Sequence, residues 1–200
     1  AQPPNSDLYT GEIAQQIAEM TGASCIVSRI SRDEMDLNRP RSRFNYPAVD
    51  EYRNVIRNIL GQKGLIDQYQ NLTQPFLHIS IHGMQDNWNR DIEIGTGYGH
   101  YCFPEIKEWM ISHVKGISQN YGVDDIFPGY TFRSVLREGD MYSATDFMGF
   151  GKCFNAVQIE ISKNWREQRQ AFLVDFFRKL VTDFNQRFVT MKPLKYPEIQ

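Results

Sequence analysis

Apolar side chains recur at helical spacing in four stretches of the chain. Residues 10–20, 47–61, 104–117 and 163–189 each place their apolar side chains on one face, which is typical of amphipathic helices packed on a core. The first predicted helix is capped by Asp7 or Thr10 and closed by Gly22. Pro47 and Pro104 stand where helices prefer to begin. The last stretch carries the widest apolar stripe, and we interpret it as core packing.

Short runs rich in β-branched residues predict strands between these helices. Residues 24–28 and 76–82 have the composition of buried strands, and residues 91–97 indicate a short strand followed by a turn. Along residues 156–161, Val157, Ile159 and Ile161 alternate with Gln158 and Glu160, which indicates a strand with two different faces. Helices that alternate with strands predict the α/β class.

Two long stretches show no sustained periodicity. Residues 29–43 hold five arginines and one proline, and they predict an irregular loop at the edge of the sheet. Residues 122–151 are rich in Gly, Asp, Tyr and Phe, with one possible short strand at 130–136. Long aromatic loops often form the walls of a pocket, so this region argues mildly for a ligand site.

Composition narrows the class of protein. Two hundred residues with 41% hydrophobic content fit one domain spanning residues 1–200. A net charge of −2 without a basic cluster argues against nucleic acid as a partner. No run of about 18 apolar residues occurs, so we expect a soluble protein without a membrane segment, with the cytoplasm as the favoured location. The three cysteines lack Cys-x-x-Cys spacing and allow at most one intrachain disulfide.

A small set of residues has the character of a hydrolase site. His82 is expected at the carboxyl end of a strand, the edge where ligands bind in open α/β sheets. Glu160 is an acid on a strand that should be central, and Asn38-Arg39 lies in a loop. Arg forms a forked clamp for carboxylates, His binds zinc, and Glu activates metal-bound water. Each residue also has a structural interpretation, as a hydrogen-bonded His, a loop ion pair or a buried ion-paired acid.

The order of these motifs resembles a known family. Its most specific element is residues 36–39, Asp-Leu-Asn-Arg, together with residues 158–160, Gln-Ile-Glu. Between them lie residues 80–83, Ser-Ile-His-Gly, and residues 91–96, Asp-Ile-Glu-Ile-Gly-Thr. Across residues 9–161 this pattern is similar to the N-formylglutamate amidohydrolase family, which is related to the zinc carboxypeptidases.

The resemblance implies a fold and a chemistry. The fold would be a mixed, twisted sheet of about eight strands with helices on both faces, as in zinc carboxypeptidases and other phosphorylase/hydrolase-like proteins. Asn38 and Arg39 would hold the substrate carboxylate, His82 would be a zinc ligand, and Glu160 would be the general base and later acid. The reaction would hydrolyse an N-acyl or peptide amide beside a free carboxylate, and the partner would be a small acidic N-acyl amino acid or peptide.

The sequence departs from the family pattern in its zinc-binding motif. The other two zinc ligands of the family come from an upstream His-x-x-Glu motif, and this sequence has no His before His78. His78 and His82 are about 13 Å apart along one strand, too far to share a zinc ion. Either the chain lacks its first strand, which the missing Met favours, or it is a metal-free binding module for acidic ligands. We expect the chain as given to bind zinc weakly or not at all.

Overall fold

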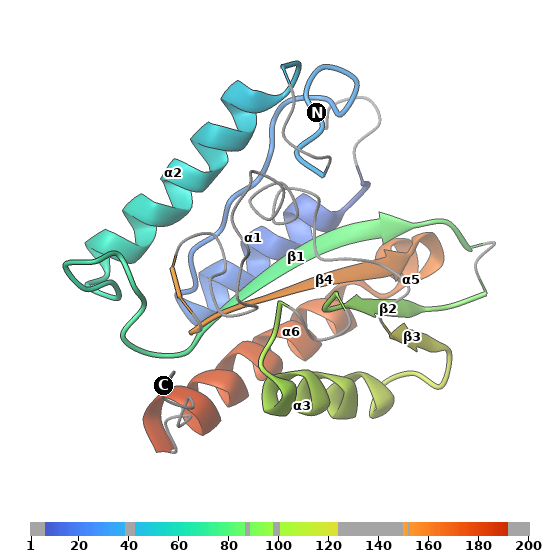
Figure 1. The fold of residues 1–200 in the computed structure, drawn as a ribbon. Helices are drawn as coiled ribbons and strands as arrows, with labels where there is room; N and C mark the ends of the chain where they lie inside the picture. The colour runs from blue at the N-terminus through green and yellow to red at the C-terminus, as the bar shows by residue number, and fades with distance from the viewer. Residues whose placement is uncertain are drawn as a thin grey trace.

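The computed structural model describes residues 7–38, 43–86, 89–97, 101–123, 150–151 and 153–191. Figure 1 shows these residues as one sheet with helices around it. The elements are α1 (Thr10–Thr21), α2 (Tyr46–Gln62), β1 (Phe76–Met84), β2 (Ile92–Gly95), α3 (Pro104–Lys115), β3 (Tyr121–Val123), β4 (Phe154–Ser162), α5 (Lys163–Gln168), α6 (Gln170–Phe184) and the π-helical segment η3 (Asn185–Met191).

The sheet has the strand order β1-β4-β2-β3. β1 pairs with β4 in parallel, β2 pairs with β3 in parallel, and β2 pairs with β4 in antiparallel fashion. The α/β class and the mixed sheet are therefore confirmed, and β4 is central as predicted. Among the described residues the sheet has four strands, and the zinc-carboxypeptidase-like fold stays a prediction. β1 lies at the edge with half-buried side chains, so its interpretation as a buried core strand was wrong.

Helices cover both faces of the sheet. Val157, Ile159 and Ile161 of β4 are fully buried on one face, in a core shared with α1, α3 and α6. On the other face, Phe154 and Ala156 pack against α2 near the beginning of the strand. The strict alternation along β4 causes this division, because successive side chains of a strand point to opposite faces. The opposite face becomes polar toward the end of β4, where Gln158 and Glu160 lie.

The first helix keeps its predicted length but not its predicted cap. Gly22 closes α1 in the left-handed conformation, with φ 71°, as expected for a residue without a Cβ atom. At the other end the N-cap position belongs to Tyr9, and it has no side-chain cap. The Thr10 hydroxyl donates instead to the Asp7 carbonyl. The Asp7 carboxylate is therefore available for another contact, which is described below.

The run at residues 24–28 is not a strand. It is extended but carries no ladder hydrogen bonds, and all of its residues except Val27 are exposed. Ile26 and Val27 line a cavity whose opposite wall is the edge of β1. Its β-branched residues therefore find apolar neighbours across a cavity instead of a partner strand, and propensity alone does not form a ladder without that partner. The prediction that this run joins the sheet was wrong.

The carboxyl-terminal helix is interrupted once and ends in a π-helical segment. Arg169 leaves helical geometry, with φ −129° and ψ 27°, and separates α5 from α6. Its predicted apolar stripe is confirmed, because Leu173, Phe177 and Leu180 are buried in the main core. The break lets α6 lie along α1 while α5 stays at the end of β4. No helix within the described ranges is long and apolar enough to cross a membrane. The three cysteines are free thiols.

Candidate functional site

The site is built on the carboxyl ends of the two parallel strands. His82 of β1 is in register with Glu160 of β4, and strands in a sheet are about 4.8 Å apart. Paired residues on neighbouring strands share a face, so the two side chains lie side by side. Glu93 of β2 continues the row on the far side of Glu160. The register therefore brings His82 and Glu160 together as predicted, while their roles stay predictions.

Asp7 completes the cluster from the segment before α1. Its Oδ2 lies 3.2 Å from His82 Nδ1, and the Gly83 N–H donates to the same carboxylate. On the other side of the imidazole, Ser80 Oγ lies 2.8 Å from His82 Nε2. The ring of His82 is thus fixed from both nitrogens. From the sequence we expected Asp7 to be a helix cap, because a contact across 75 positions of the chain leaves no local pattern that could reveal it.

The two carboxylates of the cluster are tuned in opposite directions. Burial opposes ionisation of Asp7, but the hydrogen bond and charge of His82, with help from Gly83 and Arg32, lower its pKa. Burial raises the pKa of Glu160, and the nearby charge of Asp7 acts in the same direction, against the attraction of His82. The Gln158 amide donates to Glu160 Oε1 at 2.8 Å and orients it. Catalytic sites commonly contain one carboxylate that stays ionised beside a second carboxyl group whose pKa is raised.

Glu93 lies in the same row but has a different environment. It is fully buried and ion-paired with Arg90. Gly122, its partner on β3, leaves room for this pair, because a Cβ atom there would collide with the Glu93 carboxylate. A buried acid with a charged partner and no cavity contact has a structural role, so we keep Glu93 out of the candidate site.

Arg32 connects the cluster to the loop that carries Asn38. Its guanidinium lies 3.5 Å from Asp7 Oδ1 and 3.3 Å from Asp36 Oδ2. Asp36 in turn accepts a hydrogen bond of 2.8 Å from the Asn38 backbone N–H. Asn38 is therefore brought to the cavity near His82. Arg39, the predicted clamp, lies outside the described residues, as do most of residues 122–151, including the possible strand at 130–136.

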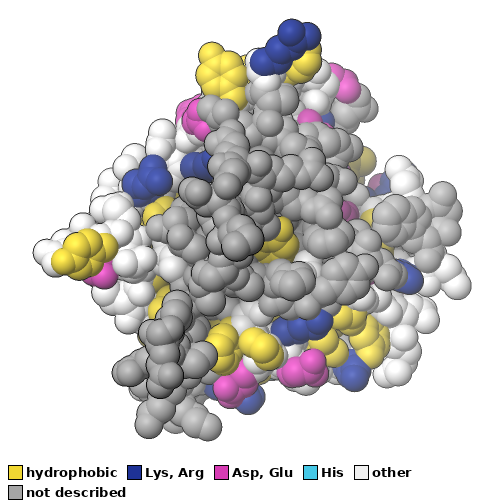
Figure 2. Space-filling view, viewed as in Figure 1, with side chains coloured by type: hydrophobic (Ala, Val, Ile, Leu, Met, Phe, Trp, Pro, Cys, Tyr) yellow, Lys and Arg dark blue, Asp and Glu magenta, His cyan; other side chains and the backbone are white. Residues whose placement is uncertain are grey.

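A cavity of about 410 Å³ adjoins this cluster, within the usual size range of ligand sites. Asp7, Arg32, Asn38 and His82 form part of its wall, and the remaining wall is largely aliphatic. Glu160 lies beside His82 without being a wall residue itself. On the surface viewed in Figure 2, acidic and basic side chains of the described residues are interspersed.

The described residues do not complete a zinc site. Asp7 and His82 are ligand types, and their 3.2 Å contact matches the spacing of two ligands on one ion. A catalytic zinc needs a third protein ligand, and in the described ranges no three His, Cys, Asp or Glu side chains converge in this way. Both ring nitrogens of His82 also have protein partners. We therefore derive no chemical step from a metal.

No family model, curated protein or solved structure matches this chain.

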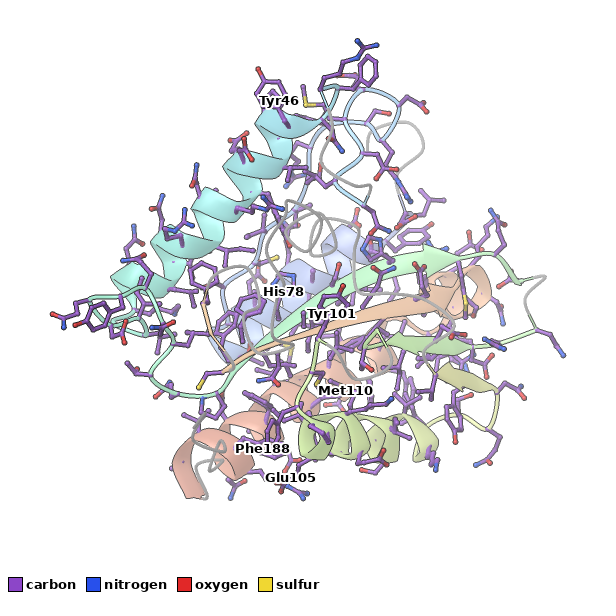
Figure 3. All side chains as sticks on the ribbon, in the orientation of Figure 1. Tyr46, His78, Tyr101, Glu105, Met110 and Phe188 are labelled. Carbon is purple, nitrogen blue, oxygen red and sulfur yellow. The ribbon has the colours of Figure 1, made fainter. Side chains whose placement is uncertain are left out.

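His78, the other histidine of β1, has a structural environment. Figure 3 shows it on the side of β1 that faces α2, where its Nε2 lies 3.0 Å from the Tyr52 hydroxyl. Its ring also stacks on Phe154. Burial, with a smaller contribution from the charge of His82, lowers the pKa of His78 from 6.5 to about 4. His78 is therefore neutral at physiological pH and supports the packing of α2.

This pKa predicts a pH dependence of stability. Between pH 6.5 and about 4, His78 is protonated in the unfolded chain but stays neutral in the folded chain. The free energy of unfolding should therefore decrease as the pH falls through this window. The loss should approach about 3 kcal/mol across that window. His78→Phe should remove this component, measured as the difference between wild-type and variant unfolding free energies at pH 7 and pH 4. Parallel curves for the two proteins would contradict the assignment.

Proposed function

We propose that this chain is an amidohydrolase domain that cleaves an N-acyl or peptide amide beside a free carboxylate. The observation that supports this proposal is the cluster of Asp7, His82 and Glu160 at the carboxyl ends of β1 and β4, next to a cavity. Open α/β sheets bind ligands at this edge. The order of the family motifs in the sequence supports the same reaction class.

The chain's own residues suggest a division of labour. Glu160, with its raised pKa, would accept a proton from the attacking water and return it to the leaving nitrogen. Asp7 would hold the His82 ring at a fixed orientation beside the scissile amide. Zinc enters this proposal only through the family resemblance, because the described residues do not complete a site for it.

Recognition of the carboxylate needs an available cation. Arg32 lines the cavity but is already in contact with Asp7 and Asp36. Arg29 also lines the cavity, and the described part of the chain gives it no acidic partner. We therefore add Arg29 to Asn38 and Arg39 as a candidate carboxylate ligand, because a guanidinium without a partner keeps its full capacity for a forked contact.

Arg29→Ala should raise KM about tenfold for substrates with a free carboxylate, which corresponds to the loss of one charged hydrogen bond. Substrates in which that carboxylate is amidated should not be affected. Arg187→Ala is the matched control, because Arg187 is half-exposed and lies next to Glu105, away from the cavity. An equal effect on carboxylate and amide substrates would remove Arg29 from the recognition site.

A second candidate function is a metal-free binding module for acidic ligands. The observation that favours it is the engagement of both His82 nitrogens by Ser80 and Asp7, which leaves the ring without an open coordination position. The two functions are separated by assaying N-acyl glutamates and short acidic peptides with added zinc and with a chelator. Release of the free amine supports the hydrolase. Calorimetric binding without any release supports the binding module.

A further inference from the structure

The cavity follows the outer edge of β1. Its wall includes Leu77, Ile79 and Ile81, which face the main core, and also His78, Ser80 and His82, which face the opposite side. Side chains from both faces of one strand can meet the same cavity only where that strand is an edge, and β1 is at the edge of the sheet formed by the described strands. Seven consecutive residues, 76–82, contribute, so the cavity extends about 20 Å along the strand.

A connected cluster of polar groups lies at one end of this cavity. Asp7 touches His82, Arg32 touches Asp7, and Asp36 connects Arg32 to Asn38. The rest of the wall is mainly apolar, with contributions from α1, α2, α6 and the segment at residues 23–30, and it also carries the polar side chains Glu12, Gln15, Ser24, Ser28, Arg29, Tyr52 and His78. The main apolar wall residues are Ala14, Ile17, Ala18, Ile26, Val27, Ile56, Ile59, Leu77, Ile79, Ile81, Phe177 and Val181.

The volume of the cavity limits the length of the group that it can hold. About 410 Å³ corresponds to roughly a dozen groups of the size of water, at about 30 Å³ each. A formyl group would fill only the polar end and would leave the aliphatic wall in contact with water, which is unfavourable.

We propose that the cavity binds a linear aliphatic acyl chain of about six to ten carbons, so that the substrates are medium-chain N-acyl amino acids. This inference rests on the proposed hydrolase function and specifies its substrate class. The amide would lie at the His82 end, and the acyl chain would run along β1 toward Phe76. Water would add to the amide carbonyl and the C–N bond would break. The products would be an aliphatic carboxylic acid and a free amino acid that has taken up the proton.

The test is a chain-length series. N-formyl, N-acetyl, N-hexanoyl, N-octanoyl, N-decanoyl and N-hexadecanoyl glutamate are compared by kcat/KM. Each methylene buried in the cavity should raise kcat/KM about three- to fourfold, with a plateau or fall beyond decanoyl when the cavity is full. A flat series, or a preference for the formyl compound, would overturn the inference. The inference would also be overturned if an extended peptide of alternating Val and Thr bound more tightly than the N-acyl glutamates, because such a peptide would pair with the edge of β1.

A variant that narrows the cavity provides a second criterion. Ala18 is half-buried on α1 and lines the cavity, so Ala18→Phe should lower kcat/KM for the octanoyl substrate at least tenfold and change that for the acetyl substrate less than twofold. Ala171→Phe is the matched control, because Ala171 is exposed on α6 and outside the cavity. Equal losses for both substrates in Ala18→Phe would overturn the assignment of the cavity.

Binding measured without turnover separates this inference from the proposed function. The Glu160→Gln protein is titrated calorimetrically with the same series, and affinity should rise with chain length and show a negative heat-capacity change. If that pattern appears while the wild-type protein hydrolyses no member of the series, the hydrolase proposal fails and the acyl-chain site stands. If hydrolysis occurs but affinity does not depend on chain length, the hydrolase proposal stands and the acyl-chain site fails.

Discussion

Glu160→Gln should lower turnover about 10²–10⁴-fold while leaving substrate binding nearly unchanged. Glutamine keeps the size of the side chain and can still form a hydrogen bond with Gln158, but it cannot take a proton from water. Because burial raises the pKa of Glu160, the acidic limb of the pH–rate profile in the wild-type protein should lie above the ordinary range of a glutamate. Steady-state kinetics between pH 4 and pH 9 measure both effects.

Glu93→Gln is the informative comparison for this variant. Glu93 faces the same side of the sheet one strand away, but it is buried in an ion pair with Arg90. Its replacement leaves Arg90 without its carboxylate partner, so we expect a loss of stability with kcat of the folded protein close to wild type. Near-normal turnover in Glu160→Gln would leave the chain without an identified base. A large loss of kcat in folded Glu93→Gln would indicate that the general base is Glu93 on β2 and not Glu160 on β4.

Gly83→Ala should destabilise the protein by about 2–4 kcal/mol and also impair the site. A Cβ atom at Gly83 would lie 2.5 Å from the guanidinium carbon of Arg166, which is buried beneath it. Arg166 donates to the carbonyls of Ile161, Met84 and Leu8, and the last of these contacts, at 2.6 Å, fixes the backbone next to Asp7. Displacing the guanidinium therefore loosens β1, β4 and the Asp7 segment together.

A second glycine provides the control. Gly61 lies inside α2, where an added Cβ atom would meet only Ile66, at an ordinary 3.7 Å. Gly61→Ala should leave stability unchanged or raise it by about 0.5–1 kcal/mol. Denaturant unfolding of both variants, together with the assay for amide hydrolysis, gives the comparison. Equal stability of Gly83→Ala and wild type would show that Arg166 does not have the anchoring role described here.

Local pattern was sufficient for most of the secondary structure. The helical spacing of apolar residues predicted α1, α2, α3 and the stripe of α6, and the alternation at residues 156–161 predicted both β4 and the separate environment of Glu160. These features are predictable because burial on one face imposes a period on the sequence. The same rule failed at residues 24–28, whose composition suits a strand but which have no partner to form a ladder.

The candidate site could be predicted only in part. His82 and Glu160 each follow from a strand pattern, and their proximity follows once the two strands pair in register. Asn38 reaches the same cavity through Asp36 and Arg32, a connection that involves only neighbours in the loop. Ser80 belongs to the predicted strand at residues 76–82, but the sequence does not reveal its contact with His82. That contact depends on the orientation of the imidazole ring, whose other nitrogen contacts Asp7.

By itself, the sequence determined the α/β class, the identity of the central strand and the residue types available for chemistry, because each of these depends on short-range periodicity or composition. Only the tertiary structure decided that β1 is an edge strand, that an aliphatic cavity follows it, and that Asp7 pairs with His82. Burial raises the pKa of Glu160, whereas the hydrogen bond and charge of His82 lower the pKa of Asp7 against the effect of its burial. These properties arise from contacts between segments far apart in the chain, and the packing of the whole domain sets such contacts.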